Sequence, residues 1–98
     1  MRILKASPAV IIHENGNIEN IAIETPFLSL KDIYLFLNCE TFEIATAYKD
    51  ELYMLIDEEG KLKNRPVNPK ASMLYREITN IPDIIAGPAI ICKQSMLE

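Results

Sequence analysis

The sequence has few of the side chains from which enzymes build active sites. Its one histidine, His13, lies beside a turn signal with no cysteine, aspartate or second histidine near it in sequence. The chain also shows no glycine-rich phosphate loop, no neighbouring cysteine and histidine pair and no metal triad. We therefore expect a non-enzymatic protein with no catalytic residue, cofactor or metal. A hydrolase built from carboxylates that are distant in sequence is the enzymatic alternative.

Cysteine and long apolar runs are also scarce. The two cysteines, Cys39 and Cys92, have neither metal-ligand spacing nor a disulfide-rich context, so we expect both thiols to be reduced and buried. No apolar run approaches the roughly 20 residues of a membrane span, and residues 1–8 lack the apolar core of a signal peptide. These features predict a cytoplasmic protein with no membrane partner, located in the host cytoplasm if a phage encodes it.

The composition predicts one packed domain over residues 1–98. Apolar residues make up 49% of the chain and charged residues 24%, which is close to the average for globular domains. The formal net charge of -4 argues against a protein that coats nucleic acid, because such proteins attract phosphates with excess positive charge. We expect no direct, sequence-specific nucleic-acid partner.

The first half of the chain predicts a hairpin followed by a helix. Residues 10–14 and 18–24 read as strands joined at Asn15-Gly16, a turn in which both positions accept a positive φ. Ser29 is a helix N-cap, and Asn38 is a suitable helix end. The apolar face of that helix, which we expect to pack on a sheet, follows the i, i+3, i+4, i+7 pattern: Leu30, Ile33, Tyr34 and Leu37.

A second hairpin follows. Phe42, Ile44, Thr46 and Tyr48 alternate with smaller or more polar residues, which predicts a strand whose Phe42 and Ile44 face meets the helix. Residues 49–51 form a polar turn into a strand over 52–56. Residues 57–60 then turn the chain toward 61–63, and we interpret this region as the second hairpin.

Residues 83–92 read as a strand that is apolar on both faces. Pro88 cannot donate a ladder hydrogen bond, so we expect this strand to bulge or to lie at a sheet edge. Burial within the chain and coverage by a second subunit, giving a homo-oligomer through residues 83–92, both remain open. The predicted fold is α+β: a small, mostly antiparallel sheet of two hairpins plus a C-terminal strand, with one amphipathic helix packed on one face and a second short helix.

The charges separate sharply at Gly60. Seven acids and one base lie between residues 40 and 59, whereas five bases and no acid lie between 61 and 76. Asn68-Pro69 is a good start for a short helix over 69–75, and a helix N-terminus beside a basic loop suits anions. The candidate ligand-binding residues are Lys63, Arg65, Asn68, Lys70 and Ser72. The alternative is a solvated loop that balances the acidic stretch.

Three segments resemble a known family. They are residues 52–62 (LYMLIDEEGKL), 65–68 (RPVN) and 83–87 (DIIAG), the last followed by an apolar strand. They resemble the small uncharacterised bacterial and phage family catalogued as domain of unknown function three-eight-four-six. The resemblance implies a small α+β domain, frequently carried by phages and other mobile elements, without an accepted active site. We interpret Gly60 as permitting a chain reversal and Gly87 as permitting a close backbone approach.

We therefore predict a non-enzymatic binding protein of phage or mobile-element type. It would sequester an anionic, nucleotide-like ligand, a phosphorylated small molecule held at the basic loop, or it would block a host defence component through an acidic host-protein surface. Two alternatives remain. The acidic stretch would make the chain a protein inhibitor that mimics nucleic acid, or the chain would be a structural accessory domain with no small-molecule ligand.

Overall fold

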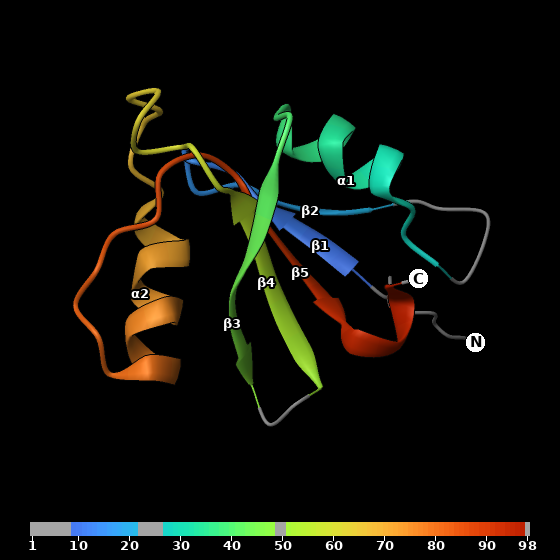
Figure 1. Ribbon diagram of the computed structural model, residues 1–98. Coiled ribbons are helices and arrows are strands. Elements are labelled where there is room, and N and C mark those ends of the chain that lie inside the picture. Colours follow the sequence, from blue (N-terminus) through green and yellow to red (C-terminus); the bar gives the residue numbers. More distant parts are fainter. Residues whose placement is uncertain (1–8, 22–26, 49–50, 98) are drawn as a thin grey trace.

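The computed structural model describes residues 9–21, 27–48 and 51–97, which form one antiparallel sheet and two α-helices (Figure 1). The five strands lie in the order β2-β1-β5-β4-β3. This arrangement confirms the predicted α+β class. The elements in chain order are β1 (Ala9–Ile12), β2 (Ile18–Asn20), α1 (Leu30–Leu37), β3 (Phe42–Tyr48), β4 (Leu52–Asp57), α2 (Pro69–Thr79), β5 (Ala89–Lys93) and a short 3-10 helix, η1 (Gln94–Met96). Neither α-helix is long and apolar enough to cross a membrane.

The N-terminal hairpin forms as predicted, but its turn differs from the expected one. The His13 N–H donates to the Asn17 carbonyl at 2.8 Å, and the Gly16 N–H donates to the His13 carbonyl at 3.0 Å. Within this turn, Gly16 has a positive φ, of 95°, and Asn15 does not. The loop consists of the three residues 14–16, and only the last of them has the left-handed backbone conformation. This type of hairpin needs a single glycine. Of the predicted second strand, residues 22–24 lie outside the described residues.

Helix α1 begins and ends where the sequence predicts. The Ser29 side chain accepts a hydrogen bond from the Asp32 N–H and the Asp32 carboxylate accepts one from the Ser29 N–H, which forms a capping box. Asn38 ends the helix with a φ of 52°. Ile33 and Leu37 are buried as expected, whereas Leu30 is 60% exposed. That part of the prediction is wrong, because Leu28 fills the core just before the cap.

Strand β5 lies in the centre of the sheet, between β1 and β4. Ile90 and Cys92 pack with α1 on one face, whereas Ala89 and Ile91 pack with α2 on the other. The two helices cover opposite faces, which explains why this strand is apolar on both sides (Figure 1). The expected bulge or edge position is therefore wrong. Pro88 immediately precedes the first strand residue, where its missing N–H removes no ladder bond.

Burial within the chain accounts for the apolar character of β5. Because β5 is not an edge strand, it offers no exposed edge that would support a homo-oligomer through residues 83–92. That oligomer stays a prediction.

The second hairpin pairs β3 with β4. The predicted pairing of residues 52–56 with 61–63 is wrong, because residues 61–63 lie in turns. Of the predicted polar turn at 49–51, residues 49–50 lie outside the described residues. Strand β3 contains a β-bulge between Ile44 and Thr46. Ile44 lies opposite Leu55, which belongs to the core beside α1, but Thr46 lies opposite Met54, which belongs to the core beside α2. An extra residue reverses the side-chain alternation, so the prediction of a single face from Phe42 to Tyr48 is wrong.

The structural roles of the two turn glycines differ from our interpretation. Gly87 has a φ of 92°, so its first requirement is conformational. A Cβ at that position would also lie 3.1 Å from the Arg65 Nε atom, so the expected close approach involves a side chain. Gly60 has no positive φ, but a Cβ at that position would lie 2.5 Å from the Ala86 carbonyl oxygen. Gly60 therefore permits two backbone segments to approach closely.

We predict that Gly60→Ala lowers the free energy of unfolding by about 2 kcal/mol or more, because a backbone oxygen must move to accept the methyl group. Chemical denaturation measures the effect. Glu58→Ala, an exposed change in the same turn, should stay within about 0.5 kcal/mol of the wild type. Equal stability of the Gly60→Ala variant and the wild type would contradict the close approach.

Candidate functional site

The predicted ligand-binding residues lie around the start of α2. Asn68 is the N-cap and Pro69 the first helical residue, as predicted, although the helix continues to Thr79 instead of ending at residue 75. The Asn68 Oδ1 atom accepts a hydrogen bond from the Ala71 N–H at 3.1 Å. This bond satisfies one of the amides that we expected to face a ligand.

Asn68 also joins α2 to two other parts of the chain. Its side chain is buried, with no exposed surface. Its Nδ2 atom donates to the Ile12 carbonyl at 2.9 Å and to the Gly87 carbonyl at 3.0 Å, and its backbone N–H donates to the Ile85 carbonyl at 2.8 Å. The side chain thus fixes the end of β1 and the segment before β5 against the helix start. In this arrangement it has no group left for a ligand.

Arg65 and Lys63 surround a buried carboxylate, that of Asp57. The Asp57 side chain has no exposed surface and accepts hydrogen bonds at 2.9 Å from both the Arg65 Nη1 and the Lys63 Nζ atoms. Arg65 Nη1 also donates to the Leu37 carbonyl at 2.8 Å and the Asn38 carbonyl at 3.1 Å. These are the last carbonyls of α1, where positive charge is stabilising. Arg65 therefore connects α1 to the end of β4.

The other two predicted residues also contact the chain itself. Lys70 Nζ donates to the Gly16 carbonyl at 2.9 Å, and Ser72 Oγ accepts a hydrogen bond from the Ile85 N–H at 2.8 Å. We call the five predicted residues, with Asp57, the polar network. They form two groups, one around Asp57 and one around the start of α2. Their role in binding a ligand stays a prediction, whereas their contacts show a structural role.

The charge on Asp57 is stabilised by its neighbours. Burial by itself raises the pKa of Asp57, but hydrogen bonds from Lys63, from the Glu59 N–H and from Arg65 outweigh it, so the pKa lies below its usual value. The same contact with Asp57 raises the pKa of Lys63. Both groups are therefore charged at neutral pH.

The surroundings of the two cysteines, in contrast, favour the uncharged form of the side chain. Both are free thiols, and Cys92 is buried as predicted while Cys39 is only half-buried. Burial, with a further contribution from the negative charge of Asp57, raises the pKa of Cys39, and burial raises the pKa of Cys92 to about 11. Protonated thiols are poor nucleophiles at neutral pH. Within the described ranges, no cluster of three histidine, cysteine or acidic side chains is placed to hold a metal.

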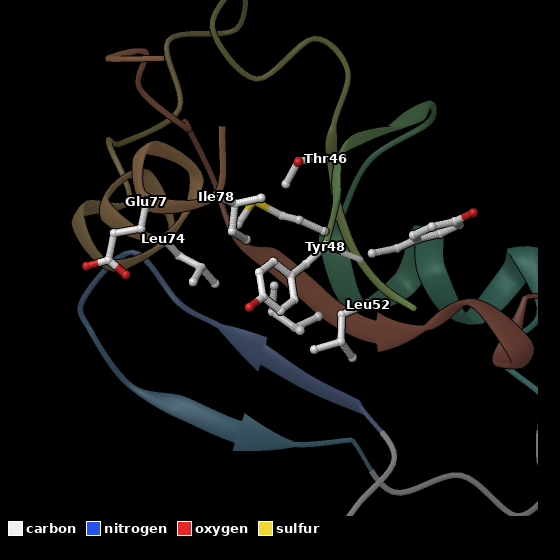
Figure 2. A pocket seen from close by; sticks show the side chains of 9 residues that line it. Thr46, Tyr48, Leu52, Leu74, Glu77 and Ile78 are labelled. Carbon is white, nitrogen blue, oxygen red and sulfur yellow. The ribbon is translucent and has the colours of Figure 1, made fainter. Parts of the chain in front are cut away.

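The sequence did not indicate a groove that lies between α2 and the β3–β4 hairpin (Figure 2). Its volume is about 410 Å³, which is within the range of ligand sites. Leu74, Glu77 and Ile78 line the helix side. The strand side and the floor are formed by β-sheet residues, chiefly Thr46, Tyr48, Leu52, Met54 and Ile91. Figure 2 shows Glu77 farther out on the helix side, beyond Leu74.

Two features create this groove, which we call the α2–β3 groove. The bulge in β3 directs Thr46 and Tyr48 to the face that α2 covers, and the C-terminal half of α2 supplies the opposite wall. The only signal in the sequence was the i, i+3, i+4 spacing of Leu74, Glu77 and Ile78, in a segment mostly beyond the predicted end of the helix. The groove offers an apolar floor, three hydroxyl side chains and one carboxylate, which suits binding of an apolar group.

We predict that the wild type loses stability as the pH falls below about 4, because Asp57 has a lower pKa in the folded protein than in the unfolded chain. Stability from this group is present above the unfolded-state pKa and is lost as the pH falls through the folded-state value. Denaturant unfolding between neutral and acidic pH measures it. Asp57→Asn should be less stable at neutral pH and should show a smaller loss in acid. A variant with the same pH dependence as the wild type would contradict the assignment.

Comparison with known proteins gives one result. The model of an uncharacterised family, described as Domain of unknown function (DUF3846), matches residues 5–96. The match extends beyond the C-terminal segments on which the resemblance rested and includes the N-terminal hairpin and α1. No curated protein and no solved structure matches the chain. Because the family model covers most of the sequence, the chain belongs to the DUF3846 family of domains of unknown function.

Proposed function

We propose that this domain is a non-enzymatic binding module that acts by occupying a surface of another protein. The observation that carries the proposal is the α2–β3 groove, an apolar concavity of about 410 Å³ next to half-exposed apolar side chains. Leu52 is 38% exposed and Tyr48 is 43% exposed at its strand side. Exposed apolar surface around a concave site is typical of protein interaction sites.

We also propose a class of target protein. If the chain is encoded by a phage or another mobile element, its partner would be a host protein, and we favour a component of the host's defence. A binder that covers a functional surface needs no catalytic group, which agrees with the chemistry that the groove offers. The alternative of nucleic-acid mimicry has less support. Asp57, one of the acids in that stretch, is buried against Arg65 and Lys63 and presents no charge to a partner.

We predict that Leu52→Glu weakens binding of the partner at least about tenfold, because a carboxylate in the groove must be desolvated when the partner binds. The partner is captured from a host extract and purified, and its Kd is measured by calorimetry. Leu35→Glu is the matched control, since Leu35 is 68% exposed on α1, on the opposite face of the sheet. It should leave the Kd within about twofold.

Two results would contradict this proposal. In the first, both variants bind the partner as well as the wild type does, so the groove is not the contact. In the second, mass spectrometry finds the partner chemically altered after incubation with the domain, so the domain is an enzyme.

An anionic, nucleotide-like ligand remains the second candidate. The observation in its favour is that Lys61 and Lys63, although paired with Asp83 and Asp57, keep 54% and 41% of their side chains exposed. Arg65 is 16% exposed and Asn68 is fully buried, so an anion would reach the lysines first. A phosphorylated ligand would compete with the two carboxylates for these ammonium groups.

We predict for this candidate that a nucleotide raises the melting temperature of the wild type and that Lys61→Gln with Lys63→Gln removes the effect. Thermal-shift measurements with inorganic phosphate and with mono-, di- and cyclic nucleotides provide the test. Lys93→Gln, an exposed change at the end of β5, serves as the control. Arg65→Glu is unsuitable, because it would place a carboxylate beside Asp57 and unfold the domain. No shift with any nucleotide would exclude this candidate.

A further inference from the structure

The α2–β3 groove carries a charge that has no partner among the residues that the structure describes. Glu77 lines the groove and is exposed. Its side chain forms no ion pair or hydrogen bond with any residue that the structure describes. The other lining residues are apolar or carry hydroxyl groups. The groove therefore combines an apolar floor with a single negative charge at its outer end.

Two acids elsewhere in the fold have lysine or arginine counter-ions. Asp57 is neutralised by Lys63 and Arg65, and Asp83 by Lys61. The carboxylate in the groove is available for a partner, and the net charge of -4 has the same sign. Long-range attraction and local pairing therefore both favour a positively charged partner.

We propose that the α2–β3 groove binds a segment of a partner protein in which an aliphatic or aromatic side chain lies next to a lysine or arginine. The apolar side chain enters the groove against Met54, Leu74 and Ile78, and the basic side chain pairs with Glu77. This inference rests on the proposed function and specifies the chemistry of its partner. It differs from the acidic host surface that the basic loop suggested, because it assigns the opposite charge to the partner.

The geometry assigns separate tasks to the two features. Burial of one large apolar side chain supplies most of the affinity, since its removal from water is favourable. Glu77 stands at the rim and remains partly hydrated, so it acts mainly on partner choice, association rate and salt dependence. A partner with an acidic residue at the same place would be rejected by repulsion.

The experiment selects random heptapeptides for binding to the immobilised full chain. We expect enrichment of peptides with an apolar residue beside lysine or arginine, and weaker binding of these peptides at high salt. On Glu77→Lys, the same apolar residues should be enriched without the basic neighbour. Wild-type-selected peptides should bind this variant about tenfold more weakly. Glu58→Lys, an exposed reversal in the turn after β4, is the matched control and should retain the wild-type selection.

Several outcomes would overturn the proposal. They are a lack of enrichment on the wild type, enrichment of acidic peptides, an unchanged basic preference on Glu77→Lys, or undiminished peptide binding to Leu52→Glu. Sedimentation that shows self-association lost in Leu52→Glu would instead make a second copy the occupant. If a purified partner depends on Leu52 but not on Glu77, this inference fails while the proposed function stands.

Discussion

The buried side chain of Asn68 holds three parts of the fold together. It has no exposed surface, so its amide groups need partners within the fold, and they bond to the Ile12 and Gly87 carbonyls and the Ala71 N–H. An unsatisfied buried polar group costs about 1 to 3 kcal/mol, so the end of β1, the start of α2 and the segment before β5 are coupled. Arg65 couples α1 to β4 in a similar way, through Asp57 and the last helix carbonyls. These contacts position α2 on the sheet and thereby form the α2–β3 groove.

This coupling changes the meaning of the charge pattern. A run of bases after a run of acids resembles an anion site, but the buried carboxylate of Asp57 uses two of those bases and the α1 carbonyls share one of them. Glu77, by contrast, is one acid in a segment with little net charge and attracts no notice in the sequence. Its environment makes it available, because it stands at the edge of an apolar concavity without a counter-ion among the described residues. Position in the fold, and not local charge density, separates structural charges from available ones.

Features set by neighbouring residues could be predicted from the sequence. The caps at Ser29, Asn38 and Asn68 and the turn glycine Gly16 follow from local hydrogen bonding and backbone freedom, and all four occur as expected. Features set by distant contacts could not. The bulge in β3 depends on pairing with β4, and the central position of β5 depends on the order of all the strands. The groove needs the bulge, the full length of α2 and the packing between them, so no single stretch of sequence encodes it.

Native-state amide hydrogen exchange tests most directly the claim that the basic loop and the start of α2 form part of the cooperative core. The N–H groups of Asn68, Ala71, Ile85 and Gly87 all donate to acceptors within the chain. The account predicts that they exchange only through global unfolding, with the same free energy as the N–H groups of Leu55 and Ile90 in the central strands. Exchange of these four amides through a local opening of much lower free energy, while Leu55 and Ile90 remain protected, would contradict it and would restore the segment as a mobile ligand-binding loop.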